Sequence, residues 1–179
     1  MLKLEDLNQT SIEQAIQEFY KTMNSHVARL VMDMAHERYS IPRDRRRMGN
    51  AEFQYYFAAD LDLLFRYALG GVEASGTLIE DIVRTVVDLL EIAPNGGRSP
   101  MEWDRFGDTP LGTALKAAEA RVRLRRQSEP LSSEEICLLS GWNVQKLASA
   151  KLTKAAKKPG TFYEPASVKE AFDKDGVRV

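Results

Sequence analysis

One stretch of the sequence decides the fold of the C-terminal part: residues 131–173, LSSEEICLLSGWNVQKLASAKLTKAAKKPGTFYEPASVKEAFD. Ser132 is a favourable helix N-cap, and Glu135, three residues later, completes a capping box. Gly141 allows the positive φ of a tight turn, and Asn143 can cap the helix that follows. The stretch therefore predicts two short helices joined by a turn.

The apolar residues of this stretch fit two helices that cross at a steep angle. Ile136, Cys137 and Leu139 are expected on the inner face of the first helix, with Cys137 as the small residue where the helices touch. Leu147 is expected to point back from the second helix. We expect Trp142, in the turn, to pack in the core of this module or against the rest of the protein, and not to stack on a base. The pattern predicts a helix-turn-helix.

The same stretch resembles the winged helix-turn-helix of the MerR regulators and the phage excisionases. Residues 135–143, EICLLSGWN, correspond to the helix and turn of that motif, and Leu147 corresponds to a leucine of its recognition helix. Residues 157–160, KKPG, would form the wing, residues 162–163 the aromatic strand, and residues 165–172 the last short helix. The resemblance covers about a quarter of the chain. It implies DNA binding by the second helix and the wing.

Candidate DNA contacts lie on the second helix and in the segment after it. The match departs from the family here, because Ala148 and Ser149 stand where arginine and tyrosine are common. The candidates for base contact are Asn143, Gln145, Lys146 and Ser149. If Asn143 is used for capping, Gln145 is the best base reader. The lysines suited to phosphate contact are Lys151, Lys154, Lys157 and Lys158.

Charge allows a nucleic-acid partner without requiring one. Residues 1–94 hold 10 basic and 15 acidic side chains, and residues 131–179 hold 8 and 6. A continuous positive surface from Lys146 to the wing would favour DNA. Pairing of the same lysines with acidic residues of the module would instead favour a helix-turn-helix that only packs against the body. Those acidic residues are Glu134, Glu164 and Glu170.

Residues 1–127 are expected to form a helical body. Apolar residues recur at helical spacing over 12–23, 27–35, 51–69 and 77–92. The last two of these helices are apolar over more than one narrow stripe, which is typical of helices packed between others or in a subunit interface. We therefore expect the body to be able to form a homodimer.

Start and stop signals frame the later body helices. Gly70-Gly71 should end one helix, and Ser75 or Thr77 should begin the next. Thr109-Pro110 is an N-cap followed by proline at the first helical position. The helix that follows has an apolar stripe, made of Leu111, Leu115, Ala118 and Val122. Its last turns carry four arginines, which complement the helix dipole or, alternatively, contact a DNA backbone: Arg121, Arg123, Arg125 and Arg126.

From composition we expect a globular protein. The hydrophobic fraction is 44% and the charged fraction 28%, which is ordinary for a folded domain. The single cysteine, Cys137, excludes a disulfide framework within the chain and a zinc cage of thiolates. No secretion signal is visible, and charged residues interrupt the most apolar segment, so we expect a cytoplasmic protein with no membrane span.

Catalytic motifs are missing from the sequence. It has no phosphate-binding glycine loop with its lysine and no nucleophile elbow. Asp33 and His36 could supply two metal ligands, but no motif points to the others that a site needs. We expect no enzyme, no metal and no cofactor. A cleft with converging titratable groups would support an enzyme instead.

The predicted architecture is all-α, with a helical body at residues 1–127 and a helix-turn-helix module with a small β wing at residues 128–179. The predicted function is that of a DNA-binding protein, a small bacterial or phage-type transcriptional regulator that uses the module. The alternative is a non-enzymatic adaptor for protein interaction, in which the helix-turn-helix is structural.

Overall fold

The computed structural model describes residues 50–90, 109–155 and 161–178, with single positions at residues 4, 7, 8, 10, 13, 14 and 107. The predicted helices over 12–23 and 27–35 lie largely outside the described residues. So do four residues weighed as site candidates, Asp33, His36, Lys157 and Lys158. Within the described part the chain is mostly helical, with six helices and one small two-stranded sheet. The prediction of a mainly helical fold is confirmed.

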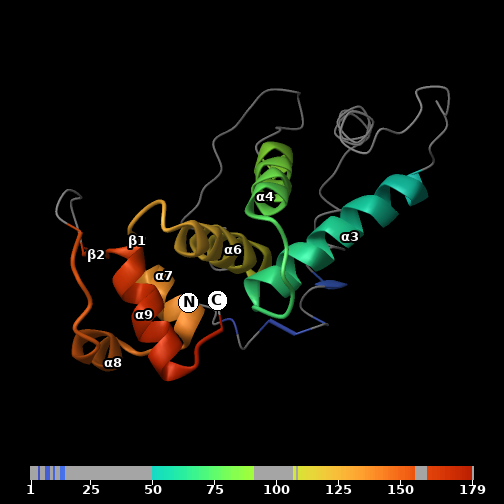
Figure 1. The fold of residues 1–179 in the computed structure, drawn as a ribbon. Helices are drawn as coiled ribbons and strands as arrows, with labels where there is room; N and C mark the ends of the chain where they lie inside the picture. The colour runs from blue at the N-terminus through green and yellow to red at the C-terminus, as the bar shows by residue number, and fades with distance from the viewer. Residues whose placement is uncertain are drawn as a thin grey trace.

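Helix α6 (Pro110–Arg126) lies at the centre of the described structure. Figure 1 shows α3 (Asn50–Ala68) and α4 (Gly76–Leu90) on one side of it and the C-terminal elements on the other. The buried apolar residues of both sides belong to a single hydrophobic cluster. The predicted boundary between residues 127 and 128 falls at the C-cap of α6, so α6 carries packing faces for both predicted parts.

The ends of α3 and α4 follow the glycine and serine signals in the sequence. Gly70 has φ +72°, and its amide donates to the carbonyl of Tyr67 at 2.9 Å. Ser75 caps α4, because its Oγ accepts from the amide of Leu78 at 3.2 Å. Glycine adopts the positive φ of Gly70 more easily than other residues do, which is why α3 ends at this point. Both predicted helix boundaries are confirmed.

Helix α6 begins at the predicted Thr109-Pro110 signal. The Oγ1 of Thr109 accepts from the amide of Gly112 at 3.1 Å, and Pro110 occupies the first turn. All four residues of the predicted apolar stripe are buried, together with seven others, so the helix is covered on most sides. At the other end Gln127 closes the helix in a left-handed conformation, with φ 51°.

The C-terminal elements follow one another closely in the chain. They are β1 (Leu131–Ser132), α7 (Ser133–Ser140), α8 (Val144–Ser149), β2 (Phe162–Tyr163) and α9 (Pro165–Asp175). The predicted capping box is present: Ser132 Oγ accepts from the amide of Glu135, whose carboxylate accepts from the amide of Ser132. The predicted turn glycine, Gly141, has φ +69°. The two short helices thus form where local signals place them.

The sheet differs from the prediction, in which a wing at residues 157–160 leads into the aromatic strand at residues 162–163. Strand β2 pairs with β1, which lies before α7, in an antiparallel register that sets Leu131 opposite Tyr163. A single further bridge joins Lys154 to Tyr163 on the other side of β2. The buried side chains of Leu131 and Tyr163 account for this partner choice, because pairing β1 with β2 places both in the core.

A second correction concerns the inner face of α7. Ile136 and Leu139 are buried as predicted, but Cys137 is partly exposed and Leu138 is buried in its place. Helix α7 contacts both α6 and α8. A helix with two neighbours buries more than one narrow stripe of residues, which explains why Leu138 is buried as well. Burial still raises the pKa of the Cys137 thiol.

Candidate nucleic-acid interface

Helix α8 buries one side chain. Of its six residues Leu147 alone is buried, and Leu147 packs in the same cluster as the body helices. The other five side chains are exposed: Val144, Gln145, Lys146, Ala148 and Ser149. A short helix that turns almost its whole surface to solvent is available to meet a partner.

The turn before α8 fixes the position of the helix. Asn143 is its N-cap, since its Oδ1 accepts from the amide of Lys146 at 2.8 Å. Ser140 Oγ donates to the carbonyl of Ile136 at 2.6 Å and accepts from the amide of Trp142 at 3.0 Å. Asn143 is therefore used for capping, the case in which Gln145 is the best candidate base reader.

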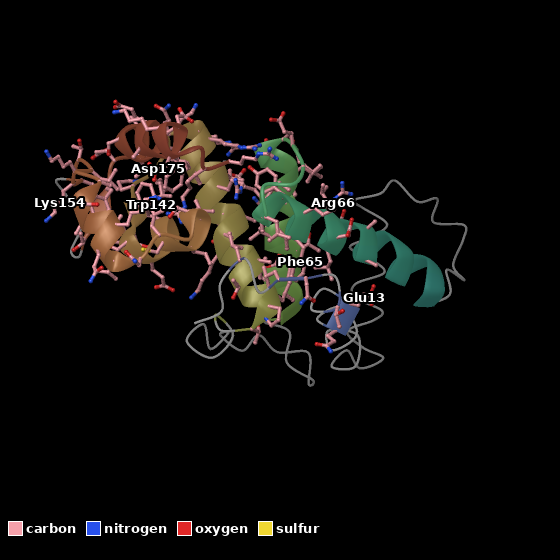
Figure 2. All side chains as sticks on the ribbon, turned by 90° about the horizontal axis from the view of Figure 1, so that it is seen from below. Glu13, Phe65, Arg66, Trp142, Lys154 and Asp175 are labelled. Carbon is pink, nitrogen blue, oxygen red and sulfur yellow. The ribbon has the colours of Figure 1, made fainter. Side chains whose placement is uncertain are left out.

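Trp142 fills the core beside the turn. Its ring is buried and meets the ring of Phe172, on α9, edge to face at a centroid distance of 5.3 Å. Figure 2 shows Trp142 among the C-terminal helices, with Lys154 at their outer edge. Of the two positions expected for Trp142, the structure shows the one in the core, against α9. The contact between the Trp142 indole and Phe172 holds α9 against the turn. It therefore also helps to position the residues at the end of α9.

Lys146 is the one cation of α8, and its charge is already engaged. Its Nζ lies 2.5 Å from Oδ2 of Asp175 and 5.2 Å from the centre of the Trp142 ring. The acidic partner comes from the end of α9, and none of the three glutamates considered in the sequence supplies it. Two of these, Glu134 and Glu170, pair with Lys116 and Lys174 instead.

Lys151 and Lys154 extend from the end of α8 into solvent. Both side chains are exposed, and within the described residues neither lies in an ion pair. Lys151 has φ 50°, which turns the chain sharply after α8. Lys154 lies on an extended segment beside β2, fixed by hydrogen bonds of 2.9 Å from Ala155 N to Phe162 O and from Glu164 N to Thr153 O. The segment and β2 form an antiparallel hairpin next to α8.

Arg121, in the arginine run of α6, faces inward. Its side chain is 1% exposed and donates to the carbonyls of Ala68, at 3.1 Å, and Arg178, at 2.6 Å. Burial, with repulsion from Arg125, lowers the pKa of Arg121 to about 10, which leaves it charged at neutral pH. This arginine joins the end of α3 to the C-terminal end of the chain and is not available to DNA.

The other three arginines of the run also have partners within the protein. Arg123 contacts the carboxylate of Glu135. Arg125 lies over the ring of Tyr67, 5.0 Å from its centre. Arg126 pairs with Glu80 and donates to Thr77. The four arginines therefore make specific contacts within the protein, in addition to complementing the helix dipole. Because each has such a partner, none of them is a free cation for contact with a DNA backbone.

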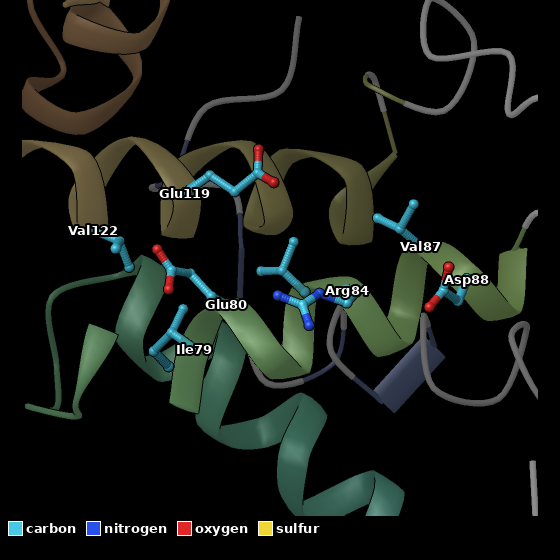
Figure 3. A pocket seen from close by; sticks show the side chains of 8 residues that line it. Ile79, Glu80, Arg84, Val87, Asp88, Glu119 and Val122 are labelled. Carbon is cyan, nitrogen blue, oxygen red and sulfur yellow. The ribbon is translucent and has the colours of Figure 1, made fainter. Parts of the chain in front are cut away.

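A groove of about 360 Å³ lies between α4 and α6 (Figure 3). Its apolar lining is made of Ile79, Val83, Val87 and Val122, and its charged residues are Glu80, Arg84, Asp88 and Glu119. Desolvation raises the pKa of Glu119, Arg123 opposes this shift, and Glu135 adds to it. Glu80 and Arg84 take part in ion pairs. The described part of the chain holds no cluster of three or more histidine, cysteine or acidic side chains that could bind a metal.

Comparison with known proteins adds no relative. No family model, no curated protein and no solved structure matches this chain. Among the described helices none has the length and apolar character needed to cross a membrane.

Proposed function

We propose that residues 128–179 form a winged helix-turn-helix that binds DNA. In this proposal α8 enters the major groove, and the hairpin formed by residues 153–155 and β2 is the wing. The observation that carries the proposal is the exposure of α8, which buries one of its six side chains directly after a helix and a tight turn. Recognition helices of this class present their first residues to base edges in the same way.

Phosphate contacts are assigned to the lysines that follow α8. Lys151 and Lys154 are both exposed. Lys151 follows the end of α8, and Lys154 lies on the hairpin. Lys157 and Lys158 belong to the connection between the two hairpin segments, outside the described residues. Cations placed in this way neutralise backbone phosphates and fix the orientation of the protein without reading sequence.

The proposed regulator has two modules, brought together by a homodimer of the helical body. Two-fold symmetry would place the modules on half-sites about 34 Å apart along the duplex. The proposal describes a small regulator of bacterial or phage type, in which the body provides dimerisation or sensing.

The test is fluorescence anisotropy of the full chain on a labelled duplex of random sequence. We expect binding that weakens steeply as salt is raised from about 50 to 200 mM. The double variant Lys151→Glu/Lys154→Glu should lose this binding, and any residual binding should have a log–log salt slope about two units shallower. The matched control is Arg66→Glu/Arg84→Glu, which makes the same change in net charge on exposed residues of α3 and α4.

Three outcomes separate the alternatives. Loss of binding in the lysine variant alone supports the proposal. Equal loss in the arginine control would place the DNA contact on the body and overturn the assignment to α8 and the hairpin. No binding at about 50 mM salt with tens of micromolar protein would reject DNA binding, since non-specific binding falls in this range. The engaged charge of Lys146 would then favour the adaptor function.

A further inference from the structure

Helix α8 has an outer face on which few of the side chains serve the fold. Successive residues of a helix are about 100° apart, so Gln145 and Ser149 lie opposite the buried Leu147. Val144 and Ala148 are one turn apart and flank Gln145 on the same side. Val144 lies about 60° from Leu147 around the helix but is exposed, as are Gln145, Ala148 and Ser149. These four exposed residues are called the outer face of α8.

Among the large apolar side chains whose exposure the structure describes, Val144 is the most exposed. It is 77% exposed, whereas Leu69 and Leu78, the other two exposed residues of this kind, are 40% exposed. A β-branched residue in the first turn of a short helix neither favours the helix nor contributes to this core. Its exposure is explained if a partner covers it.

The outer face carries no cation. Lys146 projects from the other flank of α8, where Asp175 and the Trp142 ring hold its ammonium group. Guanine is read in the major groove mainly by arginine or lysine, which donate to its O6 and N7. A face without either residue is poorly suited to G·C pairs.

The hydroxyl hydrogen of Ser149 and the side-chain oxygen of Asn143 are also engaged. Ser149 Oγ donates to the carbonyl of Lys146 at 2.8 Å, and Asn143 Oδ1 caps the helix. Gln145 is left as the residue of the outer face that can donate and accept at one base. A glutamine amide matches the N6 donor and the N7 acceptor of adenine.

We infer that the outer face of α8 selects A·T base pairs, with Gln145 on adenine and the methyl groups of Val144 and Ala148 against the thymine C5-methyl. This inference rests on the proposed function. Thymine is the one base with a methyl group in the major groove, and apolar side chains contact it there. The apolar and the amide parts of the face therefore recognise the two bases of the same kind of pair.

The experiment uses four labelled duplexes of equal length and the full chain. The first is alternating A·T, and the second has uracil in place of every thymine, which removes the C5-methyl alone. The third is alternating G·C, and the fourth has 5-methylcytosine in place of cytosine, which adds a methyl group but no adenine. We measure affinities by anisotropy at one salt concentration for the wild type, Val144→Ala, and Leu78→Ala as an exposed apolar control on α4.

The wild type should bind the A·T duplex most tightly. Replacing thymine by uracil should weaken binding about fourfold for each methyl group that the protein covers. This difference should become smaller in Val144→Ala, in which the Ala148 contact alone remains, and should keep its full size in Leu78→Ala. The 5-methyl group should strengthen G·C binding less than it strengthens A·T binding, since Gln145 finds no adenine.

Three other results would each contradict one part of the inference. Equal, salt-dependent binding of all four duplexes would overturn the A·T preference and leave DNA binding intact. A uracil effect of unchanged size in Val144→Ala would place the methyl contact elsewhere. Failure to bind any duplex would reject the inference together with the proposed function, and would leave the exposed Val144 to a protein partner.

Discussion

Eleven of the seventeen residues of α6 are buried, Arg121 among them, whereas α8 buries one residue of six. Basic residues lie close together in the sequence at the end of α6 and after the end of α8. The arginines of α6 contact carbonyls, carboxylates and a ring of the same protein. The lysines after α8, Lys151 and Lys154, point into solvent.

The difference shows that a run of cations is not by itself a nucleic-acid signal. What decides is whether the fold brings acceptors to the cations. The end of α3 supplies the carbonyl of Ala68 to Arg121, and α4 supplies Glu80 to Arg126. By contrast, the residues on the outer face of α8 are exposed to solvent. Arginine suits the first role well, because its planar group donates in several directions at once.

The largest effect is expected in the interior of α6. Arg121→Ala should lower the free energy of unfolding by about 3 kcal/mol, because the buried carbonyl of Ala68 and the partly buried carbonyl of Arg178 lose their donor and a cavity remains. Urea denaturation measures this change. The control, Arg84→Ala on the exposed side of α4, should stay within about 0.5 kcal/mol. Equal effects of the two changes would mean that Arg121 is not the internal connection described above.

The next effect concerns the anchor of α8. Leu147→Ala should cost about 2 kcal/mol of stability, the low end for a buried leucine, because α8 is short and can adjust. Val144→Ala, on the outer face, should change stability by no more than about 0.5 kcal/mol. A large cost at Val144 would show that the outer face serves the fold and would weaken the contrast between α6 and α8.

A smaller effect tests the cap of α8. Asn143→Ala should destabilise the protein by about 1 kcal/mol, since the amide of Lys146 loses its acceptor. Asn143→Asp keeps an acceptor at this position and should retain most of the stability. If both variants are equally unstable, the capping role is wrong and Asn143 returns as a candidate for base contact.

The smallest effect is expected at the ion pair between α8 and α9. Asp175→Asn removes the partner of Lys146, but the pair is partly exposed and contributes at most about 0.5 kcal/mol of stability. The released ammonium group should instead strengthen binding to random duplex DNA by about two- to threefold at low salt. Anisotropy measures this gain. Weaker DNA binding in Asp175→Asn would show that the pair positions α8 and does not compete with phosphate.

Sequence reasoning found the elements that local signals define. Thr109-Pro110, the capping box of Ser132 and Glu135, and Gly141 all mark boundaries that the structure has. These signals act over three or four residues, so the order of residues is enough to recognise them. The mainly helical fold followed from them and from the spacing of apolar residues.

Contacts between distant segments could not be predicted in the same way. The partners of Arg121 lie 53 and 57 residues away in the sequence, and Lys146 pairs with Asp175 at the end of α9. The pairing of β2 with β1 also depends on how α7 and α9 pack, and two-residue strands carry no pattern of their own. The candidate residues of α8 were found from the sequence, but which of them are occupied by capping or ion pairing needed the fold.

Hydrogen exchange of the full chain, with and without a random duplex at low salt, tests the central claim most directly. We predict that DNA slows exchange of the amides of residues 144–155 and leaves those of α6 unchanged. This result would place the contact on the exposed helix and the lysines after it. Slower exchange confined to α3, α4 or α6, with residues 144–155 unaffected under conditions in which DNA is bound, would contradict the account.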